Sequence, residues 1–329
     1  MRCLVIGASG HLGAHLCRAL LVGGAHVRAL VRPTSDLRGL DGLDAELARG
    51  DVRNAVSLAR ALDGCDAACH LAAPTSLGPG LSESIVDGTR NVLHQARRCG
   101  VGRVLYVSST VTVGYSAGPT VLDERHAVLT PASAYHVAKW HAEQEALTFH
   151  RRHGLPVVVV NPSAVVGPLD FRVTPSNAPI QRGLDRGLPF CLDGGVTPVH
   201  AADVARGCVL ALQQGRPGER YILGGDPISL PDYFRLICEL CHRRPPRFKV
   251  PRLAMLGLGA GFSLLGAAGV RNLPFTYGQA RLAGSYAWYS SRKAAEELGY
   301  SWRPVREAVA SYLDWKRGQA TPSPARQAA

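Results

Sequence analysis

Lysine is rare in this chain, which has four lysines among its 37 basic residues, and aromatic residues make up only 6% of the composition. The formal net charge is nevertheless +12. No segment interleaves basic and aromatic residues in the way that proteins which stack nucleic-acid bases do. The composition therefore argues against nucleic acid as a partner, and an anionic small molecule is sufficient to explain the excess of positive charge.

A disulfide framework and a secretory signal are also missing. The nine cysteines are an odd number scattered from Cys3 to Cys241, so we interpret them as buried thiols. The one Cys-x-x-Cys, from Cys238 to Cys241, lacks the second ligand pair of a zinc site, and no metal is expected. Because no basic n-region and apolar h-region precede the first strand-like run, the sequence predicts a cytoplasmic protein.

A long uncharged run occurs from Leu253 to Val270, directly after a basic segment from His242 to Arg252. Its 18 residues meet the lower threshold for a membrane span, but its five glycines weaken a helix. The favoured interpretation is a buried or pocket-covering helix. A surface helix that contacts a membrane beside the basic segment, a true span and a homodimer interface remain alternatives.

The first half of the chain alternates short apolar runs with longer helical patterns. The runs are CLVIG, VRALV, AACHLAA, RVLYVSS and LPVVVVNPS, and the helical patterns cover Leu12 to Val22, Ala55 to Leu62, Leu81 to Cys99 and Ala132 to His153. This alternation predicts an α/β fold with a doubly wound parallel sheet that carries helices on both faces.

The alternation fades after Pro168, where the chain becomes richer in proline and glycine. We expect one domain over residues 1–165 and a smaller region over 166–315. Residues 198–225, which end in the strand signal RYILGG, are expected to return to the first domain. Residues 316–329 have the composition of a flexible tail.

The sequence GASGHLG at residues 7–13 lies between a strand signal and a helix signal. Gly7 permits a tight turn, Gly10 lets the backbone approach a pyrophosphate, and Gly13 allows close helix packing. The helix N-terminus then offers free N–H groups and the positive end of its dipole to phosphates. We therefore predict a dinucleotide-binding turn here, with a spacing of G-x-x-G-x-x-G.

The end of the second strand indicates which dinucleotide is bound. An NAD site usually has an acidic residue here for the ribose 2′-hydroxyl, whereas an arginine accommodates a 2′-phosphate. The segment VRALVRPTSD places Arg32 at this position, and the first acidic residue, Asp36, comes later. NADP(H) is therefore favoured, with NAD(H) as the alternative.

A Tyr-x-x-x-Lys spacing occurs three times, at Tyr135/Lys139, Tyr289/Lys293 and Tyr312/Lys316. Only the first pair lies on the long helical pattern that follows RVLYVSS, whose final Ser108 and Ser109 reach the edge of the sheet where ligands bind. One helical turn separates tyrosine from lysine, so an ammonium can favour the ionised phenol for proton transfer. The later two pairs are expected on helix surfaces.

Several segments resemble, in order, the motifs of the extended short-chain dehydrogenase/reductase superfamily, also called the NAD-dependent epimerase/dehydratase family. They are GASGHLG, GDV at 50–52, HLAA at 70–73, YVSSTVTVG at 106–114, YHVAK at 135–139, NPSAVVGP at 161–168, VHAADVA at 199–205 and ERYILGG at 219–225. The likeness is greatest to the dihydroflavonol-4-reductase-like group and to hopanoid-associated sugar epimerases, and it covers residues 2–315. It implies a Rossmann-type NADP-binding domain and a smaller substrate-binding region.

The resemblance also implies roles for individual residues. Ser109 matches the catalytic hydroxyl, Tyr135 the general acid/base, and Lys139 the residue that holds the nicotinamide ribose and assists the tyrosine. The expected cofactor contacts are Gly7, Ser9, Gly10, His11, Leu12, Gly13, Arg32, Asp51, Val52, Leu71, Ala72, Ala73, Val107, Ser108, Tyr135, Lys139, Pro162, Ser163, Ala164 and Val165. Ile85 departs from the family, which commonly has asparagine there.

Three functions remain open at this level. The first is an NADP(H)-dependent oxidoreductase, a ketoreductase or alcohol dehydrogenase that acts on a small ketone or secondary alcohol. The second is a nucleotide-sugar epimerase or dehydratase with the same Ser/Tyr/Lys set; Arg32 argues against it, and Asn161 argues for it because some relatives use an asparagine there to contact a sugar nucleotide. The third is an NADP-sensing module without turnover.

Overall fold

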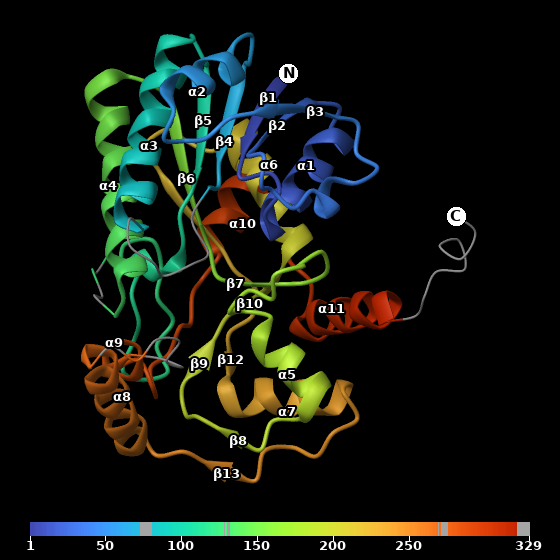
Figure 1. Cartoon of the computed structure of the whole chain (residues 1–329), viewed down its shortest axis with the longest axis vertical. Helices are drawn as coiled ribbons and strands as arrows, with labels where there is room; N and C mark the ends of the chain where they lie inside the picture. The colour runs from blue at the N-terminus through green and yellow to red at the C-terminus, as the bar shows by residue number, and fades with distance from the viewer. Residues whose placement is uncertain (73–80, 128, 130–131, 269, 271–275, 321–329) are drawn as a thin grey trace.

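Seven parallel strands form the central sheet, in the order β11-β6-β5-β4-β1-β2-β3 (Figure 1). The computed structural model describes residues 1–72, 81–127, 129, 132–268, 270 and 276–320. The strands of the sheet are β1 (Arg2–Ile6), β2 (His26–Val31), β3 (Ala45–Arg49), β4 (Ala67–His70), β5 (Arg103–Val107), β6 (Val157–Pro162) and β11 (Arg220–Leu223).

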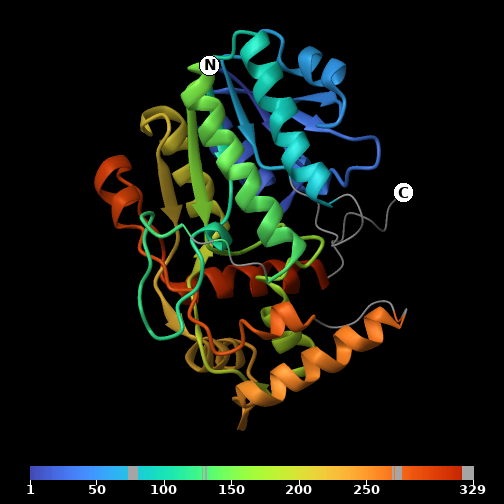
Figure 2. The ribbon, with the colours of Figure 1, turned by 90° about the vertical axis from the view of Figure 1, so that its left-hand side faces the viewer.

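Helices cover both faces of this sheet. One face carries α1 (His11–Val22), α6 (Ala201–Gln214) and α10 (Arg292–Leu298), and the other carries α2 (Ala55–Leu62), α3 (Leu81–Arg98) and α4 (Ala134–His153). Figure 2 shows α3 and α4 side by side across the second face. The strands are apolar on both sides because successive side chains point to opposite faces.

Strand β1 shows how one short run serves two cores. Cys3 and Val5 pack into the layer with α1 and α6, whereas Leu4 and Ile6 pack into the layer with α2, α3 and α4. All four side chains are fully buried. The strand order reverses between β4 and β1, and the carboxyl edge of the sheet at such a reversal is where doubly wound folds bind ligands. The doubly wound α/β prediction is therefore confirmed.

The smaller region lies beyond the carboxyl edge of the sheet (Figure 1). Helices α5 (Ala178–Arg186), α7 (Leu230–Leu240) and α11 (Val305–Ala320) form its core. This region also contains the 16-residue helix α8 (Arg252–Ala267) and several short elements: β7 (Ala164–Val166), β8 (Phe190–Cys191), β9 (Gly195–Val196), β10 (Pro198–His200), β12 (Ile228–Ser229), β13 (Phe248–Lys249) and α9 (Tyr277–Ala280). Two 3-10 helices, η1 (Arg38–Leu40) and η2 (Thr110–Thr112), lie beside the central sheet.

Helix α11 differs from the expectation for the end of the chain. It extends through residues 316–320, which the composition had assigned to the flexible tail. Lys316 packs its ammonium 4.8 Å from the centre of the Trp315 ring, and Arg317 lies in the last turn. Cationic side chains near a helix C-terminus are favourable because they face the negative end of the helix dipole.

The apolar segment 253–270 also differs from the favoured prediction of a buried helix. It forms α8 over most of its length, but Gly259 is the one residue of this helix that is buried. Gly259 packs against Ala280 of α9, while several leucines on the other sides face solvent. Within the described residues no helix is long and apolar enough to cross a membrane.

Candidate active site

The glycine turn between β1 and α1 has almost no free volume. Gly7 has φ of +93°, and a Cβ on it would lie 2.9 Å from the backbone nitrogen of Ala72. A Cβ on Gly13 would overlap the carbonyl oxygen of Gly7, whereas one on Gly10 would lie 3.3 Å from that oxygen. The turn itself therefore requires glycine at positions 7 and 13. At Gly10 there is room for a Cβ, and the absence of a side chain leaves the backbone on the outer side of the turn accessible to a ligand.

The N-terminus of α1 is open to an anion. Gly10 is its N-cap and provides no side-chain hydrogen bond, so the first N–H groups of this 12-residue helix have no cap partner. The surface beside them is bare because Gly10 has no side chain. These features fit a dinucleotide pyrophosphate, which the free N–H groups and the helix dipole would bind.

His11 begins α1 and is packed beside His15. The family that the sequence resembles often has another aromatic residue at this position. The Nε2 atom of His11 is buried without a hydrogen-bond partner, and burial lowers the pKa of its imidazole. His15 lies within 3.0 Å of the carbonyl oxygen of Pro168 through its Nε2 atom, and its ring is close to His200. His11, His15 and His200 therefore form a group of histidines beside the glycine turn and the first turns of α1. Nothing in the sequence indicated this group.

Arg32 is exposed just after β2. Among the described residues its guanidinium makes no hydrogen bond or ion pair, although it lies close enough to Asp51 to help lower the pKa of that carboxyl group. The larger cause of that shift is a hydrogen bond from Arg53, which forms an ion pair of 3.0 Å with Asp51. Val52 packs under α3 against Gly88. These residues meet at one edge of the expected cofactor site.

Ser109 and Tyr135 are brought together by η2 and the start of α4. The Ser109 hydroxyl caps η2 by accepting a hydrogen bond from the Val111 backbone nitrogen at 3.3 Å. A hydrogen bond to Ser109 favours the ionised phenol of Tyr135, but burial outweighs it and raises the pKa of Tyr135 to about 12. The phenol is thus neutral in the structure.

Lys139 lies one turn further along α4 and is buried. Its Nζ atom donates a hydrogen bond of 3.0 Å to the carbonyl oxygen of Val107. Burial lowers the pKa of this ammonium to about 8, against a raising effect from the Glu143 carboxylate. The expected lowering of the tyrosine pKa by Lys139 is therefore absent from this structure: desolvation dominates both groups. A neutral phenol is the form that donates a proton.

The remaining expected cofactor contacts lie on the glycine turn, on α1 and at the ends of β4, β5 and β6. Leu71 donates its backbone N–H to Ile6, Ala72 closes over Gly7, and the Ser108 hydroxyl is buried without a partner. Ala73 lies outside the described residues. Ser9 and Leu12 belong to the glycine turn and α1, Val107 ends β5, and Pro162, Ser163, Ala164 and Val165 lie where β6 passes into β7.

Ile85, the departure from the family pattern, is a residue of α3 and is buried in the core between this helix and the sheet. Its carbonyl oxygen accepts a hydrogen bond of 2.7 Å from the Thr89 hydroxyl, which also contacts the Nε2 atom of His70 at 3.1 Å. The side chain at position 85 therefore offers no polar group to the site. This position contributes packing in place of the amide that the family commonly has.

A buried polar network beneath Ser109 was missed in the sequence. The Oε2 atom of Glu143 accepts hydrogen bonds from Thr112 at 2.8 Å and from Asn161 at 2.7 Å, and its Oε1 atom pairs with Arg220 at 3.0 Å. Asn161 also donates to the backbone oxygen of Ser109 at 3.1 Å. Asn161 is fully buried, and its side-chain nitrogen donates within this network, whereas its Oδ1 atom is buried without a hydrogen-bond partner. The only signal in sequence was Glu143 one turn after Lys139.

The other two Tyr/Lys pairs are not on helix surfaces as expected. Tyr289 is buried before α10 begins and donates its hydroxyl to the carbonyl oxygen of Gly114 at 2.8 Å. Tyr312 is buried in the core of the smaller region and its hydroxyl contacts Gln181 at 2.8 Å. The burial of these two tyrosines could not be predicted from the sequence, because the segments that cover them are far apart in the chain.

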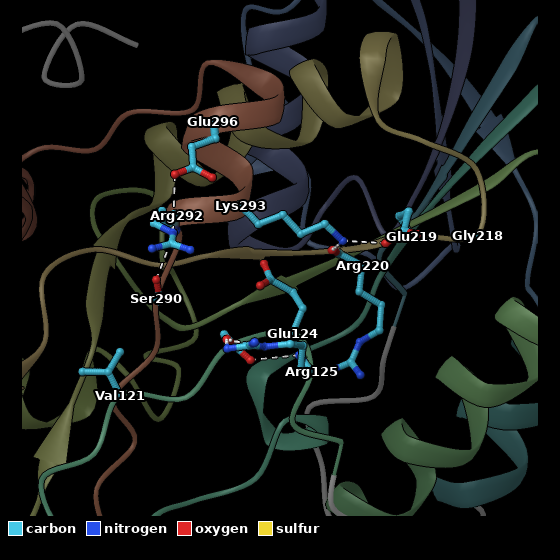
Figure 3. A pocket seen from close by; sticks show the side chains of 11 residues that line it. Val121, Glu124, Arg125, Gly218, Glu219, Arg220, Ser290, Arg292, Lys293 and Glu296 are labelled. Atoms are coloured by element: carbon cyan, nitrogen blue, oxygen red, sulfur yellow. Dashed lines mark hydrogen bonds and ion pairs between the residues drawn. The ribbon is translucent and has the colours of Figure 1, made fainter.

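A separate cavity of about 700 Å³ lies at the outer edge of the sheet, beside β11 and α10 (Figure 3). Its charged side chains largely pair with one another, as Lys293 does with Glu219 at 2.6 Å. Ser109, Tyr135 and Lys139 do not line it. This cavity is therefore distinct from the candidate site, although Arg220, which lines it, pairs with Glu143 of the network beneath Ser109.

Comparisons with known proteins show the family and the fold. Residues 3–224 match the family described as "NAD dependent epimerase/dehydratase family". The chain is 34% identical to "Sterol demethylase protein B" of Methylococcus capsulatus, over 96% of this chain and 98% of that protein. It is 30% identical, over 93% of this chain and 94% of the relative, to "4-hydroxy-2-methyl-3-oxo-4-farnesyl-3,4-dihydroquinoline-1-oxide ketoreductase" of Stigmatella aurantiaca.

A solved structure titled "Crystal structure of gox2253" superimposes with a TM-score of 0.87 at 35% sequence identity. The match covers 96% of this chain and 98% of that one. The seven-stranded arrangement and the smaller region are thus shared over nearly the full length.

Proposed function

The chain belongs to the NAD-dependent epimerase/dehydratase family, and we propose that within it the protein is an NADP(H)-dependent oxidoreductase that reduces a ketone or oxidises a secondary alcohol. Tyr135 is its general acid/base, Ser109 orients the reacting oxygen, and Lys139 supports both the cofactor and the tyrosine. A ketoreductase among the relatives supports this choice.

The observation that carries the proposal is the state of Tyr135. Burial raises the pKa of its phenol to about 12, against a smaller lowering effect of the nearby Ser109 hydroxyl, so the phenol keeps its proton at neutral pH. Reduction of a carbonyl requires a proton donor next to the oxygen. The Ser109 hydroxyl lies next to that donor and is available to bind the same oxygen.

A bound nicotinamide supplies the hydride for this reaction. The chain's own residues bind and orient: the α1 N-terminus holds the pyrophosphate, and the Lys139 ammonium lies close to where a ribose would rest. Ser109 donates to the substrate oxygen, and Tyr135 releases its proton to that oxygen as it gains negative charge. In the reverse direction Tyr135 takes the proton from the alcohol. Most of the rate gain expected from these groups comes from positioning and charge stabilisation.

NADP(H) is favoured by Arg32. Its guanidinium is exposed at the end of β2 without a partner among the described residues, and a 2′-phosphate would supply one. The nearest carboxylate, Asp51, is occupied by Arg53 and so is less available to a ribose hydroxyl. NAD(H) stays the alternative cofactor.

The substrate we favour is apolar. The names of two relatives refer to a sterol and to a farnesyl-bearing quinoline oxide. The apolar helix α8 adjoins the start of α4 through α9, because a Cβ on Gly278 would lie 2.5 Å from the Ala132 oxygen. The start of α4, which carries Tyr135, is thus close to an apolar helix.

An epimerase or dehydratase is the second candidate, because the family description names both activities. One argument for it is weakened by the structure: the Asn161 amide, which in some relatives contacts a sugar nucleotide, donates to Glu143 and the Ser109 backbone. Reaching a diphosphate would require Asn161 to break these bonds.

The test is oxidation of NADPH in the presence of a panel of sterol-like, terpenoid and aromatic ketones, with sugar nucleotides assayed in parallel. We expect ketone-dependent loss of NADPH, which falls by about 10²- to 10⁴-fold in Tyr135→Phe. Cofactor affinity should change little in this variant, and Tyr277→Phe, at an exposed tyrosine, serves as its control. Isomerisation of a sugar nucleotide without net NADPH oxidation would point to the epimerase, and cofactor binding with no turnover to a sensor.

A further inference from the structure

Helix α8 exposes an apolar surface without a covering element among the described residues. Leu253 is 81% exposed, Leu264 73% and Leu258 51%. They project from the outer side of the helix, whose inner side packs on α9 through Gly259 and through a hydrogen bond from the Tyr277 nitrogen to Ser263. Figure 2 shows α8 (orange) lying along the outside of the smaller region. Leucines this exposed indicate a surface that binds something apolar.

The segment that leads into α8 is strongly basic. Between Glu239 and Glu296 the chain contains no acidic residue. Arg244, Arg247 and Arg252 are exposed, and in the described part of the chain their guanidinium groups make no hydrogen bond or ion pair. Free cations directly beside an apolar helix fit a partner that is apolar inside and negatively charged at its surface.

The exposed apolar surface continues beyond α8. In the parallel pair of β13 with β8, Phe248 lies opposite Phe190, and these rings are 71% and 42% exposed. Figure 1 places this strand pair and the start of α8 at the same end of the molecule, away from the central sheet. Leucine, phenylalanine and arginine are thus grouped at one end of the protein.

We propose that α8, together with the basic segment 242–252, docks the protein on the surface of an anionic lipid bilayer. The helix lies in the interface with its leucines and the phenylalanine at position 248 among the acyl chains and its arginines at the lipid head groups. A second copy fits less well, because two such ends would bring Arg244, Arg247 and Arg252 of both copies together, and the Asp193 carboxylate beside this segment already pairs with Lys249 at 2.8 Å.

Docking in this orientation has a consequence for the candidate active site. Helix α9 joins α8 to Ala132, which precedes Tyr135 at the start of α4. Docking would therefore bring the start of α4, which carries Tyr135, close to the lipid surface, where an apolar substrate is dissolved. Docking itself does not depend on the proposed function, whereas this supply route does.

The experiment is flotation of the full chain with vesicles, without substrate or cofactor. We expect the protein to float with vesicles of phosphatidylcholine containing phosphatidylglycerol, and to do so at least tenfold less with phosphatidylcholine alone. Raised salt should weaken the binding, because it screens the head-group charge. Absence of flotation with anionic vesicles at low salt would overturn the proposal.

Matched variants separate the contributions of leucine and arginine. Leu253→Glu/Leu264→Glu should lower the partition coefficient roughly tenfold or more, and Arg244→Gln/Arg247→Gln about fivefold for each arginine. The controls are Val22→Glu/Val56→Glu and Arg97→Gln/Arg98→Gln, which are exposed positions on the sheet domain. The substituted residues of all four double variants lie on the surface. Melting temperatures equal to that of the wild-type protein verify that each variant is folded.

Two results would contradict membrane docking. One is equal loss of flotation in the α8 variants and the controls, which would mean that overall charge alone binds the vesicles. The other is a dimer by light scattering that dissociates in Leu253→Glu/Leu264→Glu, which would make this surface a protein interface. Because flotation is measured without turnover, a failed ketone assay leaves this result unaffected.

Discussion

At the level of a single residue, we propose that Arg32 sets the preference for NADP(H) over NAD(H). If its guanidinium binds a 2′-phosphate, Arg32→Ser should weaken NADPH binding by about tenfold to a hundredfold, the usual contribution of a hydrogen bond to a charged group. NADH binding should stay within about twofold. The measurement is the rise in melting temperature with each cofactor at equal concentration, since ligands that bind the folded state stabilise it. Arg49→Ser, at an exposed arginine that ends β3, is the control.

A larger rise with NAD than with NADP in the wild-type protein would contradict the assignment of Arg32. Equal losses in Arg32→Ser and Arg49→Ser would instead indicate a general effect of surface charge.

Glu143 is the second residue whose role can be tested. Its carboxylate is fully buried and compensates the Arg220 guanidinium at 3.0 Å. Glu143→Gln removes this charge and leaves a buried cation, which should lower the free energy of unfolding by about 3–5 kcal/mol. Glu145→Gln, on the same helix, affects only a partly exposed pair with Arg90 and should cost less than about 1 kcal/mol. Urea unfolding of both variants makes the comparison.

If Glu143→Gln and Glu145→Gln lower the free energy of unfolding by similar amounts, the Glu143 network does not stabilise the fold more than a surface ion pair does. If Glu143→Gln lowers kcat and leaves KM nearly unchanged, the network also positions Ser109, because Asn161 donates hydrogen bonds to both Glu143 and the Ser109 backbone.

The turn between β1 and α1 makes a prediction at the level of an element. Gly13→Ala forces a Cβ into the Gly7 carbonyl oxygen, so the turn must move and the melting temperature should fall by several degrees. Gly10→Ala meets its nearest atom at 3.3 Å and should fold nearly normally, yet bind NADPH at least tenfold more weakly because the methyl group faces the pyrophosphate.

Gly23→Ala, at the other end of α1 with 3.4 Å to its nearest atoms, is the control for a general effect of alanine. Normal NADPH binding by Gly10→Ala would mean that the pyrophosphate does not rest on this turn.

Stability of the whole molecule should depend on pH through its buried histidines. Burial lowers the pKa of His70 to about 3 and of His15 and His200 to about 4. The unfolded chain, with ordinary histidine pKa values near 6.5, binds more protons in this range, so the folded state loses stability as pH falls from about 6.5 towards 4. Each group contributes about 1.4 kcal/mol per pH unit.

Denaturant unfolding at pH 7 and pH 5 checks this dependence. His70→Gln should reduce the difference between the two pH values, whereas His26→Gln at an exposed position should leave it unchanged. Identical pH dependence in the two variants would rule out His70 as a source of the acid sensitivity.

Much of the fold and part of the site could be predicted from the sequence. Strands such as Arg103–Val107 and helices such as Ala55–Leu62 are encoded by local periodicity, and the GASGHLG turn is encoded by the steric needs of three glycines. Local patterns of this kind depend on neighbouring residues only, so they are readable without coordinates.

The tertiary structure decided what depends on distant residues. It buried Tyr289 and Tyr312, left α8 exposed and committed Asn161 to Glu143. Burial also raises the pKa of Tyr135, whereas from the sequence we expected the Lys139 ammonium to favour its ionised phenol. Burial and hydrogen-bond partners are fixed by the packing of segments far apart in the chain, and the free energy of a charge depends on that packing more than on the next helical turn.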